Sequence, residues 1–455
     1  MAMSTAQIIA ASRFGLGPRA NEAPPRDPRG WLVSQLKPQR DPRLAATEAA
    51  AATVSSAAIG MQTAKTTEQK LAVREATGKA ANGVRRQAGQ ARFLAAVDTD
   101  APLVDRLTSF WTNHFAISVV NPNVATFAGA MAEDAVRPHV CGRFVDMLLA
   151  VERHPAMLFY LDQVTSVGPG SPYARRAQAA RNAQRGLNEN LAREILELHT
   201  LGARSGYSQA DVTELARALT GWSVTPLTRE SVQGTRPPGS YAFLPIRHEP
   251  GQRTLLGQRF ADDGEDQARA MLEMVAMRPE TAKHLATKLA VHFVADDPPA
   301  ALIERMARAY LDSGGELIPV YRQLIEADEA WAEPYAKFRT PWDWLVASAR
   351  AIGWDEQLNA DVVLLTLGQP LWKPGAPAGW PDRNGDWAAP EAVYRRVEMA
   401  QRLAARLAAG NDARALADQV MPEGIGADSR TAIARADSPA QALVLLLASP
   451  EMMRR

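Results

Sequence analysis

Residues 188–199 read NENLAREILELH, and this stretch indicates the fold class. At about 100° per residue, Asn190, Arg193, Glu194 and Glu197 share one narrow stripe of a helix. Leucine, isoleucine and alanine fill the rest of the circumference, which is typical of a helix buried in a larger body. Apolar residues recur at helical spacing through much of the chain, whereas alternating, strand-like stretches are few. The sequence therefore predicts a mainly α fold with long irregular loops and at most a small β-hairpin.

Several helix starts are marked by a capping residue followed by proline, which suits the first helical position. These pairs are Asp27-Pro28, Asp41-Pro42, Thr340-Pro341 and Ser438-Pro439. Ser208 and Asp211 resemble a reciprocal capping box. We expect a helix to begin after each of these residues.

No shift in composition and no repeat of fixed period marks a domain boundary, so residues 1–455 are expected to form one large helical domain. Four segments stand out by composition or pattern. They are an Ala-rich helical arm (43–98) interrupted by Gly78, Gly83 and Gly89, a Gly/Pro/Arg loop (165–187), a possible small hairpin (240–260) and a Pro/Gly/Trp loop (367–389).

Composition excludes several classes of protein. With 46% hydrophobic and 22% charged residues, the chain is neither collagen-like nor wholly disordered. Its formal net charge of +1 gives no overall attraction to nucleic acid. A single cysteine, Cys141, excludes an intramolecular disulfide, and no apolar run is long enough to span a membrane. No charged segment precedes an apolar core at the N-terminus, so we expect a cytoplasmic protein, with export as the alternative.

The polar stripe on residues 188–199 has two interpretations. Buried charges need partners, so the stripe must face a site, water or a structural network. In the functional interpretation, Glu194 and Glu197 act as metal ligands or as acid/base groups. In the structural interpretation, Arg193 pairs with Glu197 one turn away.

Histidines give weaker signals. His114 lies on an apolar face, which favours a core histidine, although a base or ligand is possible where it meets the glutamate stripe. His199 falls in the apolar arc of a regular helix, so we expect a core histidine bonded to a neighbour. His284, Lys288 and His292 recur every four residues, but the two histidines lie about 12 Å apart along the axis and cannot share an ion. That face suits an anion, or is solvated.

The loop at 367–389 has the most unusual composition, with Trp372, Trp380 and Trp387 among prolines and Asp382. The tryptophans either stack on a sugar or peptide, or pack down as a lid over the core.

Other signals are weak or missing. Two basic stretches, residues 64–93 and the group Arg175, Arg176, Arg181 and Arg185, have the charge to grip phosphates, but a solvated face is favoured because aromatic residues are not interleaved. Glycine-rich phosphate loops, nucleophile elbows and the His-Glu-x-x-His motif do not occur.

Nine stretches occur in one order from residue 13 to residue 382. They are RFGLG (13–17), FWTNHFAIS (110–118), RHPAMLFYLD (153–162), NENLAREILELHTLG (188–202), ELARALTGWS (214–223), HEPGQRTLLG (248–257), KLAVHFVADDPP (288–299), KFRTPW (337–342) and GQPLWKPGAPAGWPD (368–382). Together they resemble the bacterial domain-of-unknown-function 1800 family over nearly the whole chain. Thr112 is a departure, because similar proteins carry histidine there. The resemblance implies no known reaction, and it implies relatives that look exported and are encoded near sulfatase-like proteins.

These signals predict one polar cleft between the helix of Glu194, the helix of His114, the Arg247-His248 turn and the tryptophan loop. The expected catalytic residues are Glu194, Glu197, His114 and Arg193. The expected substrate-binding residues are Asn113, Asn188, Asn190, Trp222, Trp372, Trp380 and Asp382. One divalent metal ion is expected at Glu194, Glu197, His114 and His248.

The first functional hypothesis is a hydrolase-type enzyme, metal-assisted or using carboxylates as acid and base, that acts on a glycan or another polar substrate. The second is a non-catalytic binding or assembly partner of another protein, for which the resemblance suggests a sulfatase-like protein encoded nearby. Nucleic-acid binding through the arginine-rich stretches is the least favoured.

Overall fold

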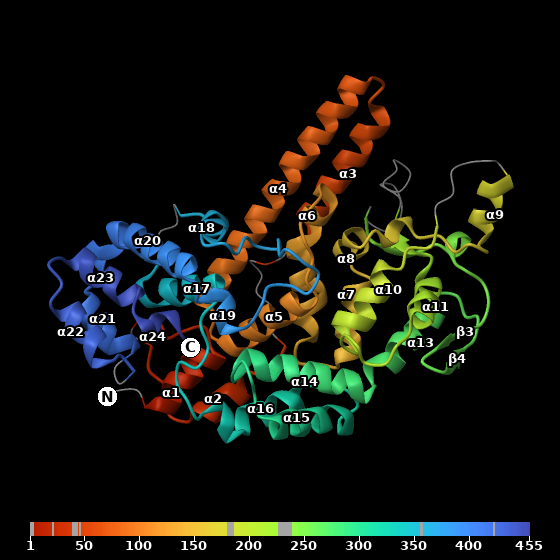
Figure 1. The fold of residues 1–455 in the computed structure, drawn as a ribbon. Coiled ribbons are helices and arrows are strands. Elements are labelled where there is room, and N and C mark those ends of the chain that lie inside the picture. The colour runs from red at the N-terminus through yellow and green to blue at the C-terminus, as the bar shows by residue number, and fades with distance from the viewer. Residues whose placement is uncertain are drawn as a thin grey trace.

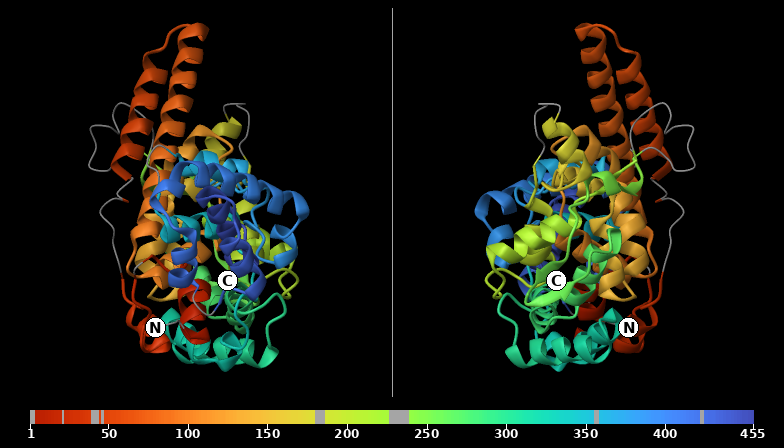
Figure 2. Two further views of the ribbon diagram at one scale, coloured as in Figure 1. Left: turned by 90° about the vertical axis from the view of Figure 1, so that its left-hand side faces the viewer. Right: turned by 90° about the vertical axis from the view of Figure 1, so that its right-hand side faces the viewer.

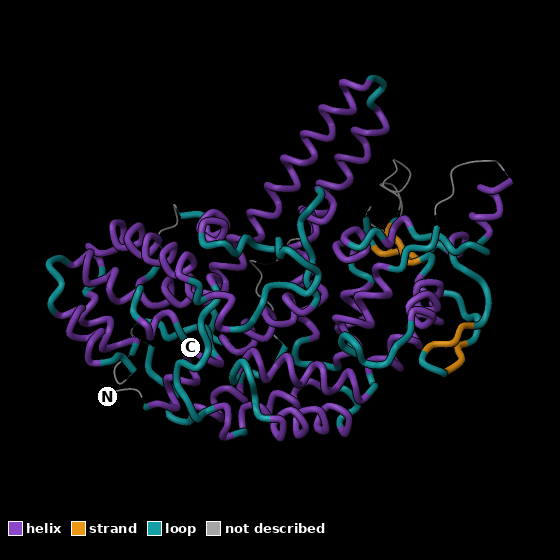
Figure 3. The backbone as a smooth tube through the Cα atoms, viewed as in Figure 1, coloured by secondary structure: helices purple, strands orange, loops and turns teal. Residues whose placement is uncertain are grey.

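A computed structural model describes residues 4–20, 22–38, 44, 47–179, 186–225, 239–354, 358–421 and 424–455. Over these residues the chain is mainly helical, which confirms the predicted class (Figure 1). Strands occur at two places, each a short antiparallel pair (Figure 3). Within the described residues, no helix is both long and apolar enough to cross a membrane.

The elements up to residue 219 are α1 (Thr5–Ile9), η1 (Ala10–Phe14), α2 (Pro28–Ser34), α3 (Thr47–Thr63), α4 (Thr67–Asp98), α5 (Pro102–His114), α6 (Pro122–Ala130), η3 (Met131–Val136), η4 (Arg137–His139), α7 (Phe144–Glu152), α8 (Pro155–Tyr160), η5 (Gln163–Thr165), α9 (Pro172–Ala179), α10 (Asn190–Glu194), η6 (Ile195–His199) and α11 (Gln209–Leu219). The elements that follow are β1 (Trp222–Val224), β2 (Tyr241–Phe243), η7 (Pro245–Arg247), β3 (Arg253–Leu255), β4 (Gln258–Phe260), α13 (Glu265–Ala276), α14 (Pro279–Phe293), α15 (Ala300–Asp312), α16 (Leu317–Glu326), η8 (Asp328–Ala330), α17 (Pro341–Ile352), α18 (Ala360–Thr366), α19 (Asn384–Trp387), α20 (Pro390–Leu407), η9 (Ala408–Gly410), α21 (Ala413–Val420), α22 (Ala427–Ala434), α23 (Pro439–Leu447) and α24 (Pro450–Met453).

The predicted helix starts are confirmed where the structure describes them. The side chains of Asp27, Thr340 and Ser438 each accept a hydrogen bond from a backbone N–H in the first turn of α2, α17 and α23. Ser208 and Asp211 form the reciprocal capping box at the start of α11. The Asp41-Pro42 pair lies outside the described residues. Local capping chemistry therefore fixes where these helices begin.

The Ala-rich arm is a helical hairpin of α3 and α4 that projects from the body (Figures 1 and 2). The expectation that Gly78, Gly83 and Gly89 interrupt it is wrong, because α4 continues through all three over 32 residues. Each glycine costs only about 1 kcal/mol relative to alanine, and packing against α3 and α6 outweighs that cost. At Gly89 a Cβ atom would lie 2.8 Å from Cδ1 of Leu371, so a larger residue there would make the Leu371 side chain shift.

The stretch 188–199 is helical and largely buried, as predicted, but it is not a regular α-helix. It forms α10 and then changes to the wider π-helical turn η6. Leu191, Ala192, Ile195 and Leu196 are buried in the core. The π turn rotates the residues after Glu194 relative to those before it, so the stripe calculated for a regular helix does not hold beyond that point.

The two strand pairs lie at separate places on the same side of the molecule, where β1 contacts α8, β3 contacts α11 and β4 contacts α13 (Figure 3). A hairpin of β3 and β4 falls inside 240–260, where one was expected, with Arg253 opposite Phe260. The second pair joins β1 to β2, with Trp222 opposite Phe243.

Buried apolar residues form two main clusters. The larger contains α5 to α8, α10, α11 and α13 to α16, whereas the smaller contains α17, α18 and the C-terminal helices α20 to α24. Leu371, in the 367–389 loop, packs against both clusters. This loop therefore runs along the junction of the two cores.

Candidate functional site

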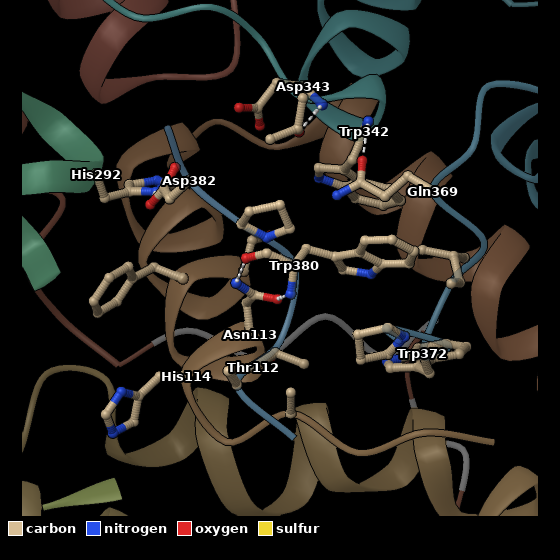
Figure 4. A pocket seen from close by; sticks show the side chains of 18 of the residues that line it. Thr112, Asn113, His114, His292, Trp342, Asp343, Gln369, Trp372, Trp380 and Asp382 are labelled. Carbon is tan, nitrogen blue, oxygen red and sulfur yellow. Dashed lines mark hydrogen bonds and ion pairs between the residues drawn. The ribbon is translucent and has the colours of Figure 1, made fainter. Parts of the chain in front are cut away.

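A pocket of about 280 Å³ lies at the junction of the two cores. Its walls come from α4, α5, α14, the start of α17 and the 367–389 loop. In Figure 4, His292 and Asp382 lie on one side of the pocket, and Trp342, Gln369 and Trp372 lie on the other. The pocket thus has a charged end and an aromatic end.

Asn113, at the end of α5, holds the loop in place. Its Oδ1 accepts a hydrogen bond from the backbone N of Trp380 at 2.7 Å, and its Nδ2 donates to the Trp380 carbonyl oxygen at 2.9 Å. Gly379 adopts a φ of +84° next to this contact, where a Cβ would collide with the Asn113 carbonyl. Asn113, which was predicted to bind substrate, lines the pocket, and both polar atoms of its side chain bind the loop backbone.

Of the two interpretations of the tryptophan loop, packing against the core describes two of its three tryptophans. Trp372 and Trp387 are buried, and Trp387 donates its Nε1–H to the Pro381 carbonyl. Val119 N donates to the Trp372 carbonyl at 2.9 Å. Trp372 and Trp380 line the pocket from this packed loop.

At the charged end, α14 and the loop bring a histidine and a carboxylate together. His292 Nδ1 lies 2.6 Å from Asp382 Oδ2 (Figure 4). Because a carboxylate accepts the proton on Nδ1, the Nε2 atom carries the lone pair. That Nε2 is buried and has no hydrogen-bond partner within the described part of the chain, although His292 lines the pocket. The wall of the pocket thus holds a basic nitrogen that is buried and has no partner among the described residues.

Electrostatics keep this pair in a neutral-imidazole, ionised-carboxylate state. Burial lowers the pKa of His292, and Asp382 opposes part of that effect. Burial acts to raise the pKa of Asp382, but His292 and Arg455 lower it overall. The main chain of Asp382 is fixed separately, because Lys337 Nζ donates to its carbonyl oxygen at 2.6 Å.

Lys288 lies one helical turn before His292 and lines the same pocket. Among the described residues it forms no hydrogen bond and no ion pair, and burial lowers its pKa to about 8. His284, a turn earlier, points elsewhere and bonds the Leu198 carbonyl through Nε2 at 3.1 Å. Of the three residues at this spacing, two reach the pocket.

His114 is the core histidine that the sequence favoured. It is 1% exposed, and its Nε2 lies 3.0 Å from the His199 carbonyl oxygen. Burial lowers its pKa well below the usual 6.5, and Lys288 adds to this effect. Its ring is stacked on Phe110 and makes edge contacts with Trp111 and Phe115. His114 also borders the pocket.

The glutamate stripe lies apart from the pocket, whose walls include neither Glu194 nor Glu197. The expected Arg193–Glu197 pair is wrong, because Arg193 Nη2 binds Glu189 Oε2 at 3.2 Å. Glu197 accepts instead from the Tyr207 hydroxyl at 3.3 Å. Burial, together with the charge of Glu197, raises the pKa of Glu194.

His199 pairs with a buried carboxylate, as expected for a core histidine. Its Nδ1 lies 2.7 Å from Glu152 Oε1, and both side chains are almost fully buried. This pair joins η6 to the end of α7.

The remaining predicted residues have local structural contacts. Asn188 donates to the Leu161 carbonyl and accepts from the backbone N of Asn190. Trp222 is buried in β1 under the guanidinium of Arg153. His248 Nδ1 lies 2.9 Å from the Thr220 carbonyl oxygen. None of these residues lines the pocket.

The metal set predicted at Glu194, Glu197, His114 and His248 does not form. Among the residues with described positions, no three His, Cys, Asp or Glu side chains are grouped so that they could hold a metal ion. Glu197 and His248 are instead engaged by Tyr207 and by the Thr220 carbonyl. The donor atoms present do not fit a metal centre at this site.

Sequence reasoning missed the His292–Asp382 pair, the wall residues Trp342 and Arg92, and the role of Asp343. His292 and Asp382 are 90 residues apart, so no local spacing joins them. One signal was available, because Lys288 and His292 are four residues apart and therefore lie on the same face of a helix, which is the face that borders the pocket.

The chain matches the protein family described as a protein of unknown function (DUF1800) over residues 9–454. No curated protein and no solved structure matches it.

Proposed function

Because the chain belongs to this DUF1800 family, whose function is unknown, we propose its function from the pocket: a hydrolase-type enzyme in which His292 is the general base. The supporting observation is the 2.6 Å contact between His292 Nδ1 and Asp382 Oδ2, with Nε2 unpartnered beside the pocket. A carboxylate that orients a histidine fixes its tautomer and stabilises the imidazolium that forms.

Water is the nucleophile in this proposal. Among the described residues no hydroxyl forms a hydrogen bond with His292 Nε2, so no side chain is placed to be activated by this base. Of the wall hydroxyls, Thr112 donates to the Thr108 carbonyl, whereas Ser109 and Thr340 accept from Arg92 and from the Asp343 backbone N. His292 Nε2 takes a proton from a water molecule, whose oxygen attacks the substrate. The imidazolium then returns that proton to the leaving group.

Two measurements test the assignment. Nitrogen NMR of histidine-labelled protein at pH 7 should show His292 neutral, with the proton on Nδ1, whereas Asp382→Asn should alter that tautomer balance. In a panel of chromogenic esters, amides, glycosides and sulfate esters, His292→Gln and Asp382→Asn should lower kcat by about 10²–10⁴-fold. His139→Gln, which changes a histidine on η4 outside the pocket, is the control. A protonated His292 at pH 7, or an activity that survives both pocket variants, contradicts the proposal.

A second candidate, an assembly partner of a sulfatase-like protein, is favoured by the projecting α3–α4 hairpin (Figure 2). Leu71 on α4 is 64% exposed, and an apolar side chain on a projecting arm suits a partner helix. Stoichiometric co-purification that is lost in Leu71→Glu supports this candidate, and a monomeric wild type without a co-purifying protein counts against it.

A further inference from the structure

Two cations of the pocket wall form no ion pair with a carboxylate among the described residues, although Glu133 and Asp105 act on Arg92, and Asp382 on Lys288, from a longer distance. Lys288 forms no ion pair or hydrogen bond among the described residues. Arg92 uses Nη2 to bind the neutral Ser109 hydroxyl at 3.2 Å, and its guanidinium lies over the Trp342 ring at 5.5 Å. Both side chains line the pocket.

The two carboxylates that line the pocket already form closer contacts with other cationic side chains. Asp343 lies 3.2 Å from both Arg106 and Arg455. Asp382 binds His292 and lies 3.8 Å from Arg455. Lys288 is therefore left without an ion pair of its own, and a buried charge without a partner is costly.

The opposite end of the pocket is aromatic. Trp342 and Trp372 are each 7% exposed, and within the described structure the Nε1 atom of each indole has no hydrogen-bond partner. Leu371 and Ile117 add apolar surface between them. A ligand that fills this end gains apolar contact, and an acceptor atom on it can take an indole N–H.

We propose that the pocket binds a small amphipathic organic anion, with its acidic group at Lys288 Nζ and its apolar part against Trp342 and Trp372. Naming this anion as the substrate rests on the proposed function, whereas its binding rests on the charges and walls of the pocket alone. Placed at Lys288, the acidic group lies one helical turn from His292. The apolar part then determines which bond faces the base.

Calorimetry with four probes tests the proposal: phenylacetate, benzenesulfonate, the neutral phenylacetamide and inorganic sulfate. We expect wild-type protein to bind phenylacetate and benzenesulfonate roughly ten- to a hundredfold more tightly than phenylacetamide, as for a charge-assisted hydrogen bond. Inorganic sulfate should bind more weakly than benzenesulfonate, because it leaves the aromatic end empty.

Variants locate the contact. Lys288→Met should remove the preference for the acid over the amide, while Lys288→Arg should keep most of it. Lys283→Met is the matched control, because Lys283 lies on the same helix but is exposed and paired with Glu304. Lys288→Met removes a buried charge, so it should fold, and its thermal unfolding checks this. Equal binding of acid and amide by wild type, or a preference unchanged in Lys288→Met, overturns the proposal.

The same experiments separate this inference from the proposed function. Asp382→Asn removes a negative charge from the pocket, so it should bind phenylacetate at least as tightly as wild type while losing any hydrolysis. Anion binding without a His292-dependent activity would refute the enzyme and keep the binding site. Turnover of neutral substrates alone, without a preference for anions, would keep the enzyme and refute the anion-binding site.

Discussion

The side chain of Asn113 forms both hydrogen bonds that the backbone of Trp380 offers, donating to its carbonyl oxygen and accepting from its N–H. A helix end thereby fixes the loop that carries Trp372 and Asp382 into the pocket. The loop has little regular structure of its own, so its conformation depends on such contacts.

The first prediction follows from this contact. Asn113→Ala should lower the free energy of unfolding by about 2–3 kcal/mol, because two half-buried backbone groups lose their partners. Hydrogen exchange should rise in the loop around Trp380 more than in α14. Asn113→Asp, which keeps the acceptor and loses the donor, should have a smaller effect on exchange at Trp380 N. Uniform exchange in both variants would contradict this role.

The second prediction concerns the buried carboxylate Asp343. Asp343→Asn should destabilise the protein by about 3–5 kcal/mol, because it leaves the buried guanidinium group of Arg106 without a counter-charge and removes the nearer of the two carboxylates at Arg455. Asp328→Asn is the control, since its pair with Arg29 is exposed and should change stability by less than about 1 kcal/mol. Urea denaturation measures both. Equal effects of the two variants would mean that burial does not decide the strength of these pairs.

The third prediction concerns His154, the N-cap of α8. Its Nδ1 accepts a hydrogen bond from Ala156 N at 3.2 Å, and burial lowers its pKa to about 3. The unfolded chain takes up a proton near pH 6.5, whereas the folded protein does not until about pH 3. Neutral His154 therefore makes its full contribution to the free energy of unfolding above pH 6.5. This contribution is lost as the pH falls toward 3, with a slope of up to about 1.4 kcal/mol per pH unit.

His154→Asn keeps an N-cap acceptor and removes the titration. Its free energy of unfolding should depend less on pH between 6 and 4 than that of wild type, with a smaller difference at pH 8. Chemical denaturation at several pH values makes the comparison. Parallel pH profiles would show that His154 is protonated in the folded protein.

The fourth prediction uses the glycines of α4. A Cβ at Gly78 or Gly83 meets no atom within 4 Å, so replacement by alanine should stabilise the protein by about 0.5–1 kcal/mol at each position. Gly89→Ala should stabilise the protein less than either of these changes, because the new methyl group makes the Leu371 side chain shift. Thermal unfolding of the three variants ranks them, and a gain at Gly89 as large as the gain at Gly78 would contradict the close contact.

Local chemistry explains what the sequence could predict. Caps such as Ser208–Asp211 act within one turn, and apolar periodicity identifies a buried helix without reference to its neighbours. Spacing alone does not determine the ion-pair partner of Arg193, because Glu189 and Glu197 both lie four residues from it. The π turn that begins at Ile195 displaces Glu197, and no feature of the sequence marked that turn.

The site was harder to predict because it is assembled over long range. The polar stripe predicted a site because its charged residues are close together in sequence. In the structure, however, Glu197 accepts a hydrogen bond from Tyr207, and Arg193 pairs with Glu189. The His292–Asp382 pair forms only once α14 and the loop have packed together. Trp372 and Asp382 were identified from the composition of that loop, but their partners required the tertiary fold.

Leu371 has a consequence for how the molecule responds to its ligand. Because this residue packs on both cores beside the pocket, an occupant there contacts both clusters of buried side chains at the seam where they meet. Occupancy should thus make the two halves melt as one unit. Substitutions deep in the C-terminal helices, far from the pocket, should in turn weaken binding by loosening the wall on their side of that seam.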